Sequence, residues 1–76
     1  MNIQDLANCT EISNAKGAQG VYAEVIIRRS GKTNYIQTRV NGKTVSVPTD
    51  AEGVIEFAGL VNRRLMAMTS VFKENV

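Results

Sequence analysis

The sequence contains no histidine, no tryptophan and only one cysteine, Cys9. Structural zinc sites are built mostly from cysteine and histidine, and histidine is the usual base beside a catalytic nucleophile. The inventory therefore predicts neither a metal site nor that type of catalysis. A lone cysteine also cannot close an internal disulfide. We expect a protein of the reducing cytoplasm rather than a secreted protein stabilised by disulfides.

Long hydrophobic runs are missing as well. No apolar run approaches the roughly 20 residues that a membrane-spanning helix needs, and the first residues lack the basic and apolar regions of a signal peptide. With 76 residues and a hydrophobic content of 43%, the chain is long enough for one modest core. We expect no membrane partner and one domain over residues 1–76. It comprises an N-terminal segment and connector (1–19), a three-stranded sheet (20–48) and a helix (49–73).

Acidic residues are absent between Val25 and Thr49. Five basic residues lie in the same stretch, which therefore carries a local charge of +5, compared with +2 for the whole chain. A negatively charged partner would be attracted to this part of the chain. The basic residues are Arg28, Arg29, Lys32, Arg39 and Lys43.

Seven carboxylates remain as candidate catalytic groups. Asp50 and Glu52 are explained by the start of the predicted helix, where negative charge is favourable. Glu24 is explained by a predicted position across the sheet from Arg39. No two carboxylates are patterned as an acid and a base held apart in a desolvated pocket. We predict that the protein is not an enzyme and uses no cofactor.

The tripeptide Gly-Lys-Thr occurs twice in the basic stretch. A phosphate-binding loop needs another glycine five residues before the glycine of this tripeptide, and Ile26 and Gln37 stand at those positions. Neither copy is followed directly by a helical pattern whose N-terminus could bind phosphate. We therefore reject nucleotide binding and interpret both copies as turns.

The two turns fix a register for three strands. Gly31-Lys32 suits a type II′ turn and Asn41-Gly42 is the favoured type I′ pair, so both hairpins have two-residue loops. The apolar residues then fall on one face, which predicts a three-stranded antiparallel meander. The predicted pairs on this face are Ile27–Ile36, Val25–Thr38, Ala23–Val40, Ile36–Val47 and Thr38–Val45.

A helix is predicted after the meander. Thr49 stands three residues before Glu52, the spacing of a capping box at a helix start. Apolar residues then recur with helical spacing, and a helix with this stripe would cover the apolar sheet face. The stripe contains Val54, Phe57, Ala58, Val61, Leu65, Met68 and Phe72. The fold class is therefore α+β, with the order βββα and a short N-terminal helix capped by Asn2.

The predicted helix is longer than the sheet that it covers. At 1.5 Å per residue it would run about 33 Å, whereas strands of six to eight residues span roughly 20 to 27 Å, so its far end should overhang. A second apolar stripe flanks Arg64. It would either receive the N-terminal segment or form a homodimer seam, and we favour the first. The stripe contains Leu60, Ala67 and Val71, and the N-terminal candidates are Ile3, Leu6 and Ile12. "SNAKGAQG", residues 13–20, has the composition of a connector.

The sheet face opposite the helix is the candidate partner-binding surface. Tyrosine and arginine are enriched at interface hot spots, and a central Ile26 has no local reason to be exposed there. An ordinary solvated sheet face is the alternative. The candidate residues are Tyr22, Ile26, Arg28, Arg29, Lys32, Tyr35, Gln37, Arg39 and Lys43.

The predicted topology resembles AP2-type and integrase arm-type DNA-binding domains over roughly residues 20–70. In those families a three-stranded sheet, backed by a C-terminal helix, enters the major groove; the tryptophan common in the plant domains is absent here. The resemblance implies base and phosphate contacts from different side chains. Base contacts would come from Arg28, Tyr35, Gln37 and Arg39, and phosphate contacts from Arg29, Lys32 and Lys43.

We favour the hypothesis that the partner is a protein. A basic patch can equally meet an acidic protein surface. The central Ile26, the low overall charge and a Glu24 that partly neutralises Arg39 all fit such an interface. The chain is similar in profile to accessory proteins of phages and other mobile elements, including anti-CRISPR inhibitors, which act by occupying a surface. We expect a small binding or inhibitor protein.

Overall fold

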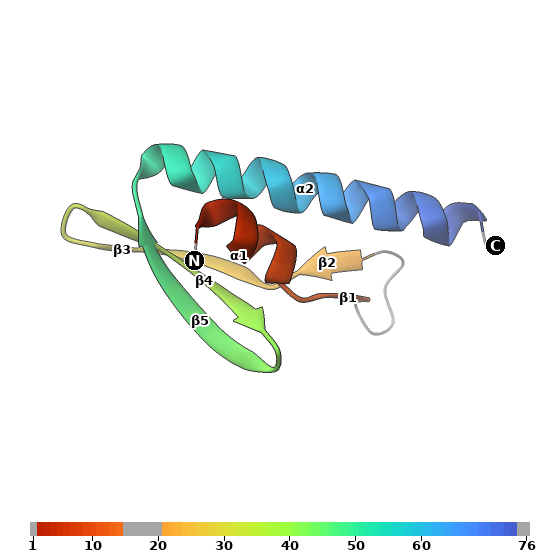
Figure 1. Cartoon of the computed structure of the whole chain (residues 1–76), viewed down its shortest axis with the longest axis horizontal. Helices are drawn as coiled ribbons and strands as arrows, with labels where there is room; N and C mark the ends of the chain where they lie inside the picture. The colour runs from red at the N-terminus through yellow and green to blue at the C-terminus, as the bar shows by residue number, and fades with distance from the viewer. Residues whose placement is uncertain (1, 15–20, 75–76) are drawn as a thin grey trace.

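The computed structural model describes the backbone of residues 2–14 and 21–74 and the side chains of residues 2–13 and 22–68. It confirms the α+β class, with a three-stranded antiparallel sheet followed by a long C-terminal helix and preceded by a short helix (Figure 1). The elements are α1 (Ile3–Cys9), β1 (Ile12–Asn14), β2 (Val21–Ala23), β3 (Val25–Ser30), β4 (Thr33–Val40), β5 (Lys43–Thr49) and α2 (Ala51–Glu74).

The sheet β3-β4-β5 has the predicted register. Ile36 lies opposite Ile27 on one side and opposite Val47 on the other. Both hairpins have two-residue turns, and the backbone angles agree with the predicted types. Gly31 has φ 62° at the first turn, while Asn41 (φ 51°) and Gly42 (φ 77°) are both left-handed at the second, as a type I′ turn requires.

A second, two-stranded sheet corrects the predicted pairing of Ala23. This residue lies opposite Ile12 of β1, and not opposite Val40. The pairing of β3 with β4 ends at Val25. Beyond this point the chain just before β1 lies beside β4, and the Glu11 N–H donates to the Arg39 carbonyl at 2.8 Å. Residues 13 and 14, interpreted as connector, therefore belong to a strand. Residues 15–20 lie outside the described residues.

The start of α2 also differs from the prediction. The N-cap is Asp50, whose Oδ1 accepts from the Gly53 N–H at 2.8 Å, and not Thr49. Thr49 is still the last residue of β5, and its side chain packs over the first turn of α2. A Cβ at Gly53 would overlap Thr49 Oγ1. The close approach of strand and helix therefore requires glycine at this position.

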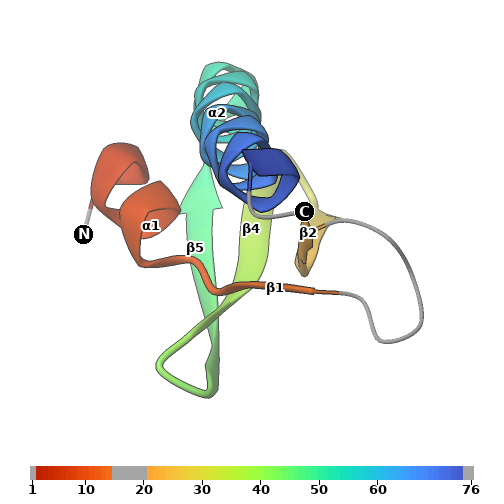
Figure 2. The same cartoon turned by 90° about the vertical axis from the view of Figure 1, so that its right-hand side faces the viewer.

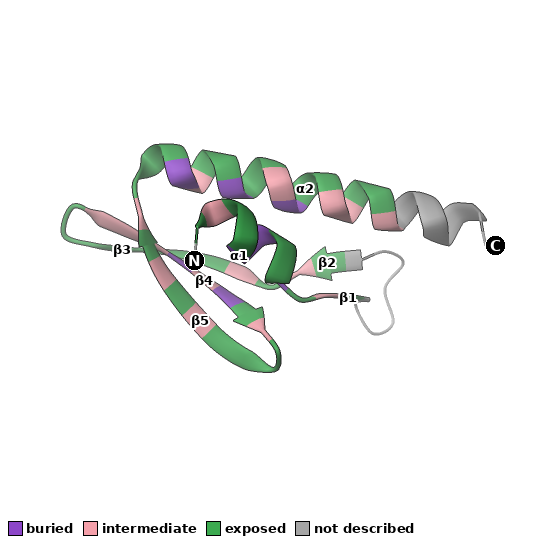
Figure 3. Ribbon diagram, viewed as in Figure 1, coloured by how far each residue is buried: buried purple, intermediate pink, exposed green. Residues whose placement is uncertain are grey.

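The core lies between the sheet, α1 and α2 (Figure 3). Ile36 of β4, Phe57 and Val61 of α2, and Leu6 and Ala7 of α1 are its buried apolar residues. Burial of these side chains, and of the partly buried apolar residues that pack against them, favours folding. Of the predicted helix stripe, Ala58 is exposed and the side chain of Phe72 lies outside the described residues.

The N-terminal helix covers part of the second stripe of α2. Ile3 of α1 and Leu60 of α2 are partly buried and both pack against the core, which agrees with the favoured prediction. Ile12 instead contributes to β1. Ala67 is exposed, and the Val71 side chain lies outside the described residues, so a homodimer seam there stays a prediction.

Capping interactions hold α1 at both ends. The Asn2 side chain accepts from the Asp5 N–H at 2.8 Å, as predicted. At the other end, Thr10 Oγ1 donates to the Leu6 carbonyl at 2.7 Å, and Arg64 of α2 donates to the Ala7 carbonyl at 2.6 Å. The Ala7 carbonyl is one that the helix leaves without an internal partner, whereas the Leu6 carbonyl also accepts from the Thr10 N–H at 2.9 Å.

The molecule is elongated, with extents of 46 × 20 × 18 Å. The 24 residues of α2 set the long axis, because they span about 36 Å, and Figure 1 shows its C-terminal end passing beyond the strands. Figure 2 views the molecule along α2, with α1 beside it and the strands below. No helix in the described part of the chain is long and apolar enough to cross a membrane.

Candidate functional site

The open face of the sheet is formed by the side chains that alternate away from α2. Ile26, Gln37 and Ser46 lie side by side across the three strands. Ile26 is 49% exposed although it is an apolar residue of this face. Covering an exposed isoleucine with a partner removes apolar surface from water, which favours binding. The row that contains Ile26 is therefore a candidate contact surface.

A depression of about 230 Å³ lies beside this row, between Ile26 and Gln37 on one side and the neighbouring pair Arg39–Thr44 on the other. Ile26 and Gln37 line it together with polar and charged side chains, so an apolar side chain lies next to hydrogen-bonding groups. Apolar contacts with polar groups beside them are common at protein interfaces. The remaining lining residues are Glu24, Thr38, Arg39 and Thr44.

Arg39 has a different acidic partner from the one predicted. Its Nε lies 3.8 Å from Oε2 of Glu11, and its Nη2 donates to the Gly42 carbonyl at 3.5 Å. The other carboxylate oxygen of Glu11 accepts from the Gly42 N–H. Glu24 does not pair with Arg39, because the ladder between β3 and β4 begins at Val25, one residue later. The backbone carbonyl of Glu24 accepts instead from Thr38 Oγ1 at 3.1 Å.

Arg28 and Tyr35 form the next row of the open face. They lie opposite each other on β3 and β4, with Pro48 of β5 beside Tyr35. Arg28 is exposed and Tyr35 is half-buried. The structure therefore brings five of the predicted residues together on one face. They are Ile26, Arg28, Tyr35, Gln37 and Arg39.

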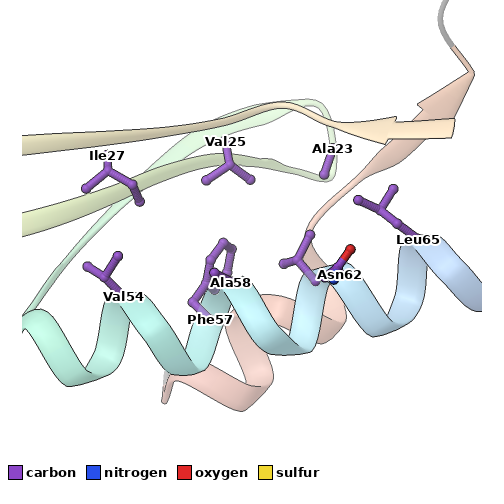
Figure 4. Close-up of a pocket in the computed structure, with 9 residues that line it drawn as sticks. Ala23, Val25, Ile27, Val54, Phe57, Ala58, Asn62 and Leu65 are labelled. Atoms are coloured by element: carbon purple, nitrogen blue, oxygen red, sulfur yellow. The ribbon is translucent and has the colours of Figure 1, made fainter.

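Tyr22 extends this face onto the second sheet. It lies on β2 opposite Ser13 and is exposed. The side chains of Ala23, Val25 and Ile27 all face α2 (Figure 4), so alternation continues through Glu24 and directs Tyr22 to the open side.

The other three predicted residues lie at the margins. Lys32 is in the β3–β4 turn, and Lys43 begins β5 directly after the β4–β5 turn. Both are exposed. Arg29 shares its side of β3 with Ile27, away from the open face, and its Nε donates to the Gly31 carbonyl at 3.2 Å. The five predicted cations are thus distributed over both faces of the sheet and the ends of its two hairpins.

Sequence reasoning missed a second surface on the other side of β3. Ile27 was expected in the core but is 46% exposed. Its side chain lies at the mouth of an apolar groove of about 230 Å³ between β3 and α2 (Figure 4). The cause is the position of α2, which packs Phe57 against the core and leaves the outer side of β3 uncovered. The groove is lined by Val25 and Ile27 of β3 and by Val54, Ala58 and Leu65 of α2.

Comparisons of the chain with protein families, curated proteins and solved structures find no significant match. In the described residues, no group of three or more cysteine, histidine or carboxylate side chains is placed to hold a metal ion.

Proposed function

We propose that this protein is a small, non-enzymatic binding protein that engages a protein partner through the open sheet face, in the manner of an inhibitor or accessory protein. The observation that carries the proposal is the half-exposed Ile26 on the wall of a depression that polar and charged side chains also line. A partner that covers Ile26 would remove its apolar surface from water while Gln37 and Arg28 make polar contacts at the margin.

A photocrosslinking experiment tests this proposal. Benzoylphenylalanine is placed at position 26 and, as the control, at position 56, where Glu56 is exposed on α2. We expect a discrete protein adduct from position 26 in cells that contain the natural partner, and none from position 56. The adduct should be lost when Tyr35→Ala is added, because an interface aromatic side chain contributes a large share of binding energy.

Equal labelling from positions 26 and 56, or an adduct that tolerates Tyr35→Ala, would contradict the proposed surface. Folding of each variant is checked by circular dichroism, so that a lost adduct cannot come from an unfolded chain.

DNA binding by the same face is the second candidate function. The observation that favours it is that Arg28 and Arg39 are exposed on this face, with Lys32 and Lys43 exposed at the two hairpin ends. The Glu11–Arg39 ion pair and Glu24 in the depression reduce the positive potential there, which is why we rank DNA second. If DNA is the partner, affinity for a fluorescent duplex falls steeply between about 50 and 200 mM salt.

Two substitutions make the DNA test specific. Each phosphate contact adds roughly one unit to the slope of log affinity against log salt, so Arg28→Ala or Lys32→Ala should flatten that slope. Absence of binding at the lower salt concentration, or slopes that neither variant changes, would remove the DNA candidate.

A further inference from the structure

One edge of the three-stranded sheet is uncovered. Among the described residues, β3 pairs with β4 and with no other strand, and every residue from Ile26 to Ser30 is exposed. An edge strand presents unpaired backbone N–H and C=O groups, and these can form a ladder with a further strand.

The hairpin geometry identifies the backbone groups at this edge. β3 and β4 are joined by a two-residue turn, so Ser30 and Thr33 close the ladder as a hydrogen-bonded pair. Hydrogen-bonded and non-hydrogen-bonded pairs alternate along an antiparallel ladder. The backbone groups of Val25, Ile27 and Arg29 are therefore directed away from β4, toward the free edge.

The same residues border the apolar groove. Val25 and Ile27 face α2 across it (Figure 4), and two exposed apolar residues of α2 lie beyond the residues that line the groove. Ile55 is 74% exposed and Met66 is 65% exposed, and both lie on the flank of α2 that Ala58 occupies. A strand added to β3 would direct every second side chain into this groove.

Charge specifies the occupant. The opposite side of the β3 edge carries Arg28, and Arg29 and Lys32 follow at the hairpin end, without an acidic residue in β3. A second copy of this chain offers only Glu24 as an acidic residue beside such an edge, against three basic residues, so a more acidic strand complements the edge better. An incoming strand with carboxylates would instead place them beside Arg28, on the face away from the groove.

We propose that the β3 edge binds an extended segment of a protein partner by strand addition, and that this segment alternates apolar residues, facing the groove, with acidic residues, facing Arg28. The inference rests on the proposed function in taking a protein as the partner. It adds a binding mode at the edge and groove, which the open-face contact does not require.

A peptide titration tests the proposal directly. The probe is a fluorescent peptide of about eight residues that alternates valine and glutamate, long enough to pair with β3. We expect saturable binding with a Kd of about 10 to 500 μM, and about tenfold weaker binding when lysine replaces glutamate. Absence of binding, or equal binding of the lysine peptide, would overturn the proposal.

Methylated peptides separate strand addition from simple burial in the groove. In an antiparallel pair, the residues that share a face with Ile27 are also those that hydrogen-bond to the edge. N-methylation of the valines should therefore abolish binding, whereas N-methylation of the glutamates should leave it within a few-fold. Loss of binding with both peptides, with neither, or only with the glutamate-methylated peptide contradicts an added antiparallel strand.

A pair of variants gives the same distinction on the protein. Ile27→Ala and Ile27→Pro both remove the isoleucine side chain, but only proline removes the outward N–H, which the β3–β4 ladder does not use. We expect Ile27→Pro to bind about tenfold more weakly than Ile27→Ala, and equal affinities would contradict the proposal. If Ile27→Pro does not fold, the methylated peptides decide the question alone.

Sedimentation of the protein without peptide distinguishes a partner strand from a second copy. We expect a monomer at about 100 μM, whereas a dimer that Ile27→Pro dissociates would show that the chain itself occupies the edge, overturning the proposal. The open-face function is read separately from the crosslink at position 26. If the peptides do not bind but the crosslink from position 26 is still observed, strand addition is rejected and the open-face proposal is not.

Discussion

Arg64 of α2 donates through Nη1 to the backbone carbonyl of Ala7, 2.6 Å away at the C-terminal end of α1. The same nitrogen lies 2.7 Å from the carbonyl oxygen of Asn8 and 3.2 Å from that of Thr10. One guanidinium thus satisfies carbonyls at the end of a seven-residue helix and places positive charge at the negative end of its dipole. A helix this short is not stable alone, so this contact and the burial of Leu6 hold it in place.

Arg64→Ala should therefore destabilise the protein. Hydrogen bonds to a charged donor are each worth about 1.5 to 3 kcal/mol, and we expect a loss of about 2 to 3 kcal/mol in the free energy of unfolding by urea denaturation. Arg63→Ala is the matched control, because Arg63 is exposed and its loss should change stability by less than about 0.5 kcal/mol. Equal effects of the two substitutions would show that Arg64 does not anchor α1.

Two glycines of α2 should respond in opposite ways to the same substitution. At Gly59 nothing lies near an added Cβ, so Gly59→Ala should stabilise the helix by about 0.5 to 1 kcal/mol. At the buried Gly53 an added Cβ would overlap Thr49 Oγ1, so Gly53→Ala should destabilise by about 1 to 3 kcal/mol. Thermal unfolding of both variants measures the difference in sign.

The overlap at Gly53 can itself be tested by a double substitution. Thr49→Ala removes the oxygen that an added Cβ would meet, so Gly53→Ala should cost less in that background than in the wild-type chain. If the cost is unchanged, the contact with Thr49 is not the reason that glycine is required.

The three-stranded sheet could be predicted because its determinants are local. Gly31 and the Asn41-Gly42 pair each specify a two-residue turn, and each turn fixes the register of its hairpin. The pairing of Ala23 with Ile12 could not be predicted in the same way. The two strands have three residues each, which is too few to show an alternating pattern, and the sequence between them does not specify a two-residue turn.

The candidate site was predictable only to the extent that the register was. The rows containing Ile26 and Arg28 follow from the hairpins, whereas the Glu11–Arg39 pair joins residues 28 positions apart and depends on how the N-terminal segment crosses the end of β4. The exposure of Ile27 was missed because alternation indicates which face a side chain occupies. It does not indicate how far an overlying helix covers that face.

The Glu11–Arg39 contact should contribute little as an ion pair and more as a turn contact. Exposed pairs are typically worth up to about 1 kcal/mol, and Glu11 also accepts from the Gly42 N–H. We expect Glu11→Ala to destabilise more than Arg39→Ala. A double-mutant cycle should give a coupling below about 1 kcal/mol that decreases with salt. A coupling independent of salt would rule out a screened ion pair.

The exposed end of the second stripe should not control oligomeric state. Because α1 packs beside Leu60, Ala67 is the exposed residue of the stripe among those whose side chains the structure describes. We expect Ala67→Glu to leave the sedimentation coefficient unchanged at about 100 μM protein, since stable interfaces bury roughly 800 Å² per partner. Dissociation of a dimer by this substitution would instead establish the seam.

Ile26 and Ile36 allow the openness of the sheet face to be tested on the same sheet. Ile36 is fully buried beneath α2, so Ile36→Asp places a carboxylate in the core and should prevent folding. Ile26 is half-exposed on the other face, and Ile26→Asp should change the free energy of unfolding by less than about 1 kcal/mol. Circular dichroism during thermal unfolding measures both. If Ile26→Asp also fails to fold, the open face is buried in the native state, and a surface free for a partner must be sought elsewhere on the molecule.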